Sequence, residues 1–190
     1  MRSIISLILF AIVIFLGYTL FKNIQEPIAF QAEKATRLDK VTGQLENIRT
    51  SQEIYRAITG QFAPNFDTLS MVLKSDSIPF INIVGDPDDP TKEFTKTITY
   101  SSALDSIRAL KINLDSLRYV PYSSSKVFNM TADTITYQQT LVQVVEVGTR
   151  WKEFMGKFAS PKFTKYDNSY DPNALLKFGD MSKPTLSGNW

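Results

Sequence analysis

The first residues of the chain differ from the rest in their hydrophobic pattern. Residues 4–21 contain no charged side chain and consist mainly of bulky apolar residues. At about 1.5 Å per residue, a helix over this run extends about 27 Å, close to the thickness of the hydrocarbon core of a bilayer. The pattern therefore predicts a transmembrane helix over 4–21, within an anchor and juxtamembrane segment that extends over 1–27.

A cleaved signal peptide is the alternative interpretation of this segment. Signal peptides have a shorter apolar region and end in small residues, whereas Leu20, Phe21 and Lys22 stand at the end of this one. We therefore expect the segment to stay in the protein as a signal anchor, with the lipid bilayer as its first partner.

From about residue 28 to residue 59 the apolar residues recur at intervals of three and four, which is the period of an amphipathic helix. We expect Pro27 to mark a bend or the first turn of this helix, and Gly60 to end it as a C-cap. Two interpretations of the apolar stripe are open: it packs on the core of its own domain, or it binds a second helix as a coiled coil at the membrane surface. The stripe comprises Leu38, Val41, Leu45, Ile48, Gln52 and Tyr55.

Beyond residue 60, shorter patterns predict small helices and several strands. Asp67 is expected to cap a helix that continues to Lys74. Segment 104–120 is expected to begin as a helix and to continue as an extended segment. Strands, the last of them in an antiparallel meander, are expected at 78–84, 94–100, 126–132, 135–138 and 140–149.

These elements predict an α+β fold, in which the transmembrane helix continues into a long amphipathic helix packed on a small antiparallel β-sheet. The folded domain is expected over 28–150. Residues 151–190 are rich in Lys, Pro, Asn, Asp and Ser, and we expect them to form a mostly irregular C-terminal tail that wraps the domain.

Composition excludes several classes of function. The chain has no cysteine and no histidine, which removes thiol nucleophiles, Ser-His-Asp triads and nearly all zinc, haem and copper ligation. Its 21 basic and 19 acidic residues leave no surplus of positive charge for binding nucleic acid. We therefore predict a protein that is not an enzyme and that has no nucleic-acid partner.

One acidic cluster is a candidate metal site. Asp86, Asp88 and Asp89 lie in a loop that contains two prolines, and carboxylate oxygens are the ligands that calcium prefers. The spacing departs from the EF-hand pattern. Calcium is therefore the only cofactor that the sequence suggests, and the alternative is a solvated turn braced by its prolines.

A second recurring pattern is an aspartate followed by serine or threonine and then by an aliphatic residue, methionine or threonine. It occurs five times, against about one occurrence expected from the composition. The pattern resembles the O-glycosylation acceptor on exported proteins of one group of Gram-negative bacteria. The alternative is that the aspartates begin turns and cap helices. The hydroxyl residues concerned are Thr68, Ser77, Ser106, Ser116 and Thr134.

The two signals for membrane orientation disagree. Basic residues are more frequent after the apolar run than before it, which favours a cytoplasmic domain. The acceptor pattern favours an exported one. We expect a single-pass protein of the bacterial inner membrane with its domain in the periplasm. The basic residues are Arg2 before the run and Lys22, Lys34, Arg37 and Lys40 after it.

The layout of a hydrophobic helix, an amphipathic helix and a small sheet resembles that of type IV pilins and type II secretion pseudopilins. The local match is the run from Leu45 to Tyr55, followed by Gly60, Phe62 and Leu69, and the resemblance covers about the first 75 residues. It implies a structural or assembly component whose partners are other membrane or secretion-system proteins.

This chain departs from the family pattern at its start. No basic leader ending in glycine precedes the apolar run, and no glutamate stands near the beginning of that run. The resemblance therefore implies an anchored, stationary component more than a filament subunit. The alternatives are a bitopic scaffold that pairs through the coiled coil and a periplasmic sensor or ligand-binding module.

Overall fold

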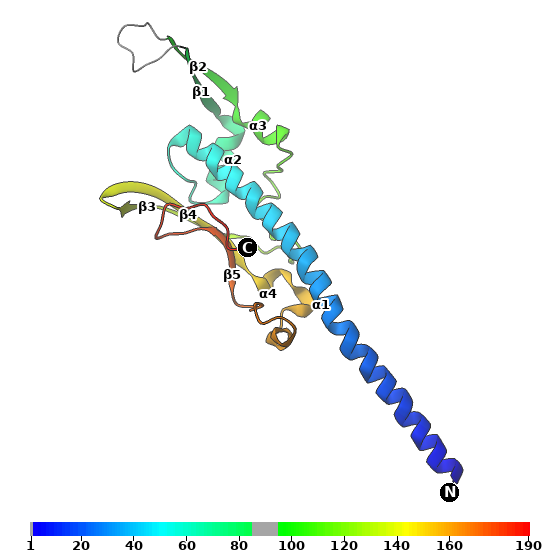
Figure 1. Cartoon of the computed structure of the whole chain (residues 1–190). Coiled ribbons are helices and arrows are strands. Elements are labelled where there is room, and N and C mark those ends of the chain that lie inside the picture. The colour runs from blue at the N-terminus through cyan, green and yellow to red at the C-terminus, as the bar shows by residue number, and fades with distance from the viewer. Residues whose placement is uncertain (1, 85–94) are drawn as a thin grey trace.

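The computed structural model of this chain describes residues 2–84 and 95–190 and has an α+β fold. One long helix, α1 (Arg2–Thr59), projects from the domain at its N-terminal end, and the other elements lie along its C-terminal half or, in the case of one two-stranded hairpin, beyond its C-terminal end (Figure 1). The predicted fold class, a long N-terminal helix with small antiparallel sheets, is confirmed.

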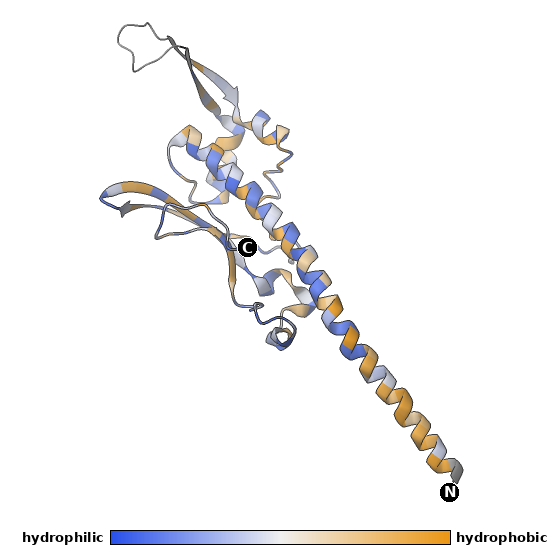
Figure 2. Ribbon diagram, in the orientation of Figure 1, coloured by the Kyte–Doolittle hydropathy of each residue, from blue (hydrophilic) through white to orange (hydrophobic). Residues whose placement is uncertain are grey.

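The N-terminal part of α1 extends away from the domain. Its apolar side chains are exposed, and the helix is long and apolar enough to cross a membrane (Figure 2). Both expectations for Pro27 are wrong: it is not the first turn of a helix, because it lies inside α1, and α1 runs without a visible bend (Figure 1). The ring of Pro27 removes one backbone hydrogen bond, and the packing of Phe30 one turn later stabilises the helix on the C-terminal side. The predicted C-cap is correct, since Gly60 has a φ of +80° and donates to the carbonyl of Arg56.

The apolar stripe of α1 lies in the core of its own domain. Val41, Leu45 and Ile48 are completely buried, Tyr55 is 8% exposed, and Leu38 packs at the margin. This burial leaves no surface for a second helix, so the structure contradicts the coiled-coil interpretation of the stripe. The core partners from other elements include Leu69, Leu73, Ile107, Val145, Val147, Leu176 and Phe178.

Gln52 is the polar member of this stripe, and it is completely buried. Its side-chain amide donates to the carbonyl of Ala63 at 3.0 Å and accepts from the backbone N–H of Ala63 at 2.8 Å. Both ends of the amide are thus satisfied, which is what a buried polar group requires. Gln52 therefore ties the chain that leaves α1 back onto the helix.

The segment after α1 forms a small lobe at the end farthest from the N-terminus, which we call the distal lobe (residues 65–84 and 95–118) (Figure 1). It contains α2 (Phe66–Ser75), the antiparallel hairpin of β1 (Ser77–Val84) and β2 (Thr95–Ser102), and α3 (Ala103–Ala109). The strands agree with those predicted. The cap of α2 does not: Asn65, and not Asp67, accepts from the N–H of Thr68.

After α3, segment 110–118 is made of turns, so the extended run expected there is reduced to an isolated β-bridge between Tyr119 and Val127. A three-stranded antiparallel sheet follows, in the order β3 (Asn129–Tyr137), β4 (Thr140–Arg150), β5 (Leu175–Gly179). The two short strands expected at 126–138 form the single strand β3. Its turn to β4 is tight, with positive φ at Gln138 and Gln139.

The C-terminal segment is more ordered than the irregular tail that we predicted. It contains α4 (Trp151–Phe154), two 3₁₀ turns, η1 (Gly156–Phe158) and η2 (Pro161–Tyr166), and the edge strand β5. Strand β5 was missed because its five residues form a strand only against the edge that β4 provides. Side chains of this segment complete the core: Phe154, Met155, Phe158, Phe163 and Tyr170 are all buried.

Candidate functional site

The candidate calcium ligands Asp86, Asp88 and Asp89 lie outside the described residues. Within 2–84 and 95–190, no group of three or more acidic side chains is arranged so that it could hold a metal ion. Calcium binding by the loop therefore stays a prediction.

The five candidate acceptor hydroxyls all lie at or near the protein surface. Ser77, Ser116 and Thr134 are exposed, and Thr68 and Ser106 are half-buried. None of their preceding aspartates is the N-cap of a described helix, since Asn65 caps α2 and Ser102 caps α3. The helix-cap explanation of the pattern is therefore wrong for α2 and α3, and glycosylation stays a prediction. In four of the five copies the third residue is buried in the core, namely Leu69, Ile78, Ile107 and Leu117.

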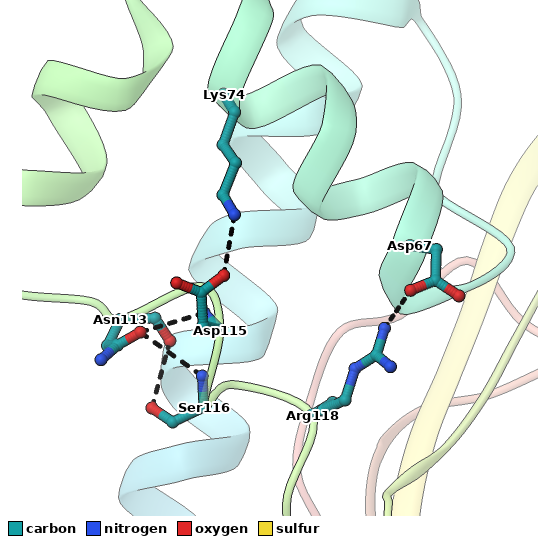
Figure 3. Close-up of polar contacts among 6 residues, drawn as sticks. All are labelled: Asp67, Lys74, Asn113, Asp115, Ser116 and Arg118. Carbon is teal, nitrogen blue, oxygen red and sulfur yellow. Dashed lines mark hydrogen bonds and ion pairs between the residues drawn. The ribbon is translucent and has the colours of Figure 1, made fainter.

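The structure brings two of these copies together at a cleft in the distal lobe (Figure 3). Lys74 of α2 forms an ion pair with Asp115 at 2.7 Å, and Arg118 forms one with Asp67. Asn113 Oδ1 accepts from the N–H groups of Asp115 and Ser116, which fixes the turn. The cleft of about 450 Å³ between them is thus balanced in charge, and its ion pairs connect α2 to the loop after α3.

The other end of the domain, where α1 leaves it, is built around Phe30. This ring is completely buried and is surrounded by aromatic rings of the C-terminal segment. It stacks on Phe163 at 5.4 Å and meets Phe158 and Tyr170 edge to face at 5.6 and 5.1 Å. Such aromatic pairs add to the stabilisation from burial. We call residues 26–37 and 151–170 the membrane-proximal junction.

Polar contacts frame this aromatic cluster. Lys34 and Asp167 form an ion pair at 2.5 Å, and both side chains are largely buried. The Tyr166 hydroxyl donates to Glu26 at 2.7 Å, and Arg37 donates to the carbonyl of Phe154 at 2.6 Å. Together these contacts attach the C-terminal segment to three turns of α1.

The same contacts shift two carboxyl pKa values. The hydrogen bonds from Lys34 and from the Ser169 hydroxyl hold the pKa of Asp167 well below its ordinary value of 3.8. The hydrogen bond from Tyr166 lowers the pKa of Glu26, and the charges of Lys162 and Lys165 add to this effect. Both carboxylates therefore stay ionised at neutral pH, as ion-pair partners and not as proton donors.

A groove of about 500 Å³ opens beside the junction, between α1 and the two 3₁₀ turns. Its walls are mainly apolar, and lysines lie around them. We call it the juxtamembrane groove. It is lined by Tyr18, Phe21, Lys22, Gln25, Glu26, Ala29, Lys157, Phe158, Lys162 and Phe163.

Neither the junction nor the groove is predicted by the hydrophobic pattern of the sequence. A local signal was present: three lysines between residues 151 and 170 each directly precede an aromatic residue. In the structure each ammonium lies over the ring of its neighbour, Lys157 at 4.9 Å from Phe158, Lys162 at 4.5 Å from Phe163 and Lys165 at 4.4 Å from Tyr166. The rings turn inward to pack around Phe30, so the lysines are left on the surface around the groove.

Among the described residues, the groove presents lysine ammonium groups, apolar walls and one ionised carboxylate. This combination is suited to binding an anion with an apolar part. Comparison with protein-family models, with curated proteins and with solved structures gave no match for this chain.

Proposed function

We propose that this chain is a membrane-anchored, non-enzymatic structural or assembly component, with a pilin-like domain on the periplasmic side of a bacterial inner membrane. The observation that carries the proposal is the continuity of α1. Its first part presents only apolar or uncharged side chains from residue 4 to residue 21, and its second part is the central element of the domain core. A rigid helix shared by anchor and domain is suited to holding that domain at a fixed height and orientation.

The packing of α1 supports the pilin-like alternative over the bitopic coiled coil. In a coiled-coil scaffold the stripe of α1 is the contact surface for a partner. Here the stripe faces the chain's own sheet and helices, with Val41, Leu45 and Ile48 completely buried. A helix whose N-terminal half projects and whose C-terminal half packs on a small antiparallel sheet is the layout that the resemblance implied.

Cysteine labelling tests this proposal, because the natural chain has no cysteine. Ser124→Cys places one thiol at an exposed position of the domain, and Ile8→Cys places one in the apolar run. In intact spheroplasts we expect a membrane-impermeant maleimide to label Cys at position 124 and to leave position 8 unlabelled. Labelling of position 124 only after lysis would place the domain in the cytoplasm and overturn the proposed orientation.

Two further measurements on the same membranes separate the other parts of the proposal. Resistance of the protein to alkaline extraction tests the anchor, and release into the supernatant would refute it. Intact-mass measurement tests the five acceptor hydroxyls, because each added glycan raises the mass by a defined step. Loss of the added mass in Ser116→Ala or Thr134→Ala, at two of the three exposed sites, would locate it.

A further inference from the structure

The juxtamembrane groove lies at the depth where a bilayer ends. Tyr18 and Phe21 belong to the last turn of the apolar run, and Ala29 belongs to the part of α1 that enters the domain. Tyrosine and other aromatic residues at the end of a membrane span sit at the level of the lipid headgroups. The groove therefore opens toward the headgroup layer when residues 4–21 lie in the hydrocarbon.

The charge around the groove is positive. Lys22, Lys157 and Lys162 line it, and the carboxylate that lines it with them is Glu26. Glu26 lies 3.5 Å from Lys162 and 4.0 Å from Lys165, and it also accepts the hydroxyl of Tyr166. Within residues 2–84 and 95–190, Lys22 and Lys157 form no ion pair. Glu33 also faces Lys157, but its carboxylate is paired with Arg37 at 2.6 Å. Three lining ammonium groups against the one lining carboxylate leave a surplus that a phosphate group can neutralise.

The walls of the groove are suited to a lipid more than to a free anion. Phe21, Ala29 and Phe163 line its floor and sides with apolar surface, and this surface continues into the lipid-facing surface of α1. An inorganic phosphate contacts only the lysines. A phospholipid places its phosphate among the lysines and the first part of an acyl chain against the rings, so both parts of the lining are used.

We propose that the juxtamembrane groove binds one anionic phospholipid of the bilayer that holds α1. The lysines Lys22, Lys157 and Lys162 take the headgroup phosphate, and the aromatic walls take the upper acyl chain. This inference rests on the proposed membrane anchoring. Its consequence is that the lipid attaches the C-terminal segment to the membrane surface and fixes the tilt of the domain.

The test uses the full chain reconstituted in vesicles of phosphatidylcholine that contain a small fraction of spin-labelled phosphatidylglycerol or spin-labelled phosphatidylcholine. For the natural protein we expect about one motionally restricted phosphatidylglycerol per chain, preferred over phosphatidylcholine by at least about fivefold, the factor that one lysine–phosphate contact supplies. The triple variant Lys22→Gln, Lys157→Gln, Lys162→Gln should reduce this preference to less than about twofold.

A matched variant carries the same loss of charge away from the groove: Lys40→Gln, Lys111→Gln, Lys183→Gln, all at exposed positions. We expect it to keep the full preference. An equal loss in both variants would show diffuse attraction to the surface and overturn the groove site. Circular dichroism of both variants checks that the domain is folded, because the three groove lysines are exposed and their removal should leave the aromatic cluster intact.

Two outcomes distinguish the inference from the function on which it rests. If the protein floats with the vesicles but shows no preference for phosphatidylglycerol, the groove site is refuted and the anchor stands. If the protein does not float, the anchor itself is refuted. A last measurement adds millimolar inorganic phosphate to the vesicles. If phosphate abolishes the preference for phosphatidylglycerol, the groove is a site for a free anion, and the lipid assignment is overturned.

Discussion

Phe30 at the membrane-proximal junction is completely buried among the aromatic rings of the C-terminal segment, whereas Phe80 on the distal hairpin exposes 51% of its surface. Tyr100 and Ile98 on β2 are exposed to a similar or greater extent. The two-stranded hairpin projects from the domain, and such a hairpin has little stability of its own (Figure 1).

This difference indicates that the contacts of the junction contribute more to the stability of the fold than those of the distal hairpin. At the junction, side chains that are more than 120 residues apart in the chain meet in one buried cluster, so breaking it separates α1 from the C-terminal segment. In the distal hairpin Ile78, at the start of β1, belongs to the core. Beyond Ile78 the contacts of the hairpin are mainly between β1 and β2, so they can be lost without opening the core. The end of the domain from which the apolar part of α1 projects is therefore rigid, and the opposite end is adaptable.

The largest effect is expected from Phe30→Ala, which removes the ring at the centre of the junction. Deleting a buried aromatic side chain costs about 3–5 kcal/mol of unfolding free energy, because the cavity adds to the loss of burial. The matched change Phe80→Ala should cost less than about 1 kcal/mol. Denaturant unfolding in detergent, followed by the fluorescence of Trp151 next to the cluster, measures both. An equal loss of unfolding free energy in the two variants would contradict the contrast between the junction and the distal hairpin.

A second, smaller effect is expected from Gln52→Leu. The substitution leaves the buried N–H and carbonyl of Ala63 without partners, which should cost about 2–3 kcal/mol. The neighbouring Ser51→Ala is the control, since Ser51 is equally buried but its hydroxyl bonds only to Asn47 within the helix. It should change stability by less than about 1 kcal/mol. An unchanged unfolding free energy in Gln52→Leu would show that the backbone N–H and carbonyl of Ala63 form other hydrogen bonds.

The ion pair of Lys34 and Asp167 should make the junction sensitive to acid. Because folding lowers the pKa of Asp167, its contribution is fully present above the ordinary pKa of 3.8 and is lost as the pH falls below that value. Asp167→Asn should cost about 1 kcal/mol at neutral pH and reduce the loss of stability in acid. Asp115→Asn breaks an exposed distal pair and should cost less than about 0.5 kcal/mol. Urea unfolding at pH 7 and pH 3 measures the difference, and an unchanged acid dependence in Asp167→Asn would contradict it.

The smallest effects are expected in the hairpin. Tyr100→Ser and Ile98→Ser remove exposed apolar surface and should change the unfolding free energy by less than about 0.5 kcal/mol. Hydrogen exchange should show the amides of β1 and β2 exchanging before those of β4, whose strand lies between two others. A cost above about 1 kcal/mol, or protection equal to that of β4, would show that the hairpin belongs to the same cooperative unit as the junction.

The elements that the sequence predicted are those with a local signal. The apolar run of residues 4–21 and the stripe from Leu38 to Tyr55 follow the helical period over many turns, so their assignment needs no knowledge of the partner. Strands β1, β2 and β4 likewise have apolar patterns of their own. Asn65 replaced the expected cap Asp67 because the choice between neighbouring polar residues depends on where the chain enters the helix.

The sequence by itself determined the apolar helix that is long enough to cross a membrane, the amphipathic helix, the α+β class and the absence of thiol and imidazole side chains. The tertiary structure alone decided that the stripe is core and not a partner surface, that 175–179 is a strand, and that Phe30 meets Phe163. It also gathered Lys22 and Lys157 around one groove, although 135 positions separate them. The physical reason is that these features depend on contacts between distant segments, whose pairing is fixed by the packing of the whole core and by no pattern within either segment.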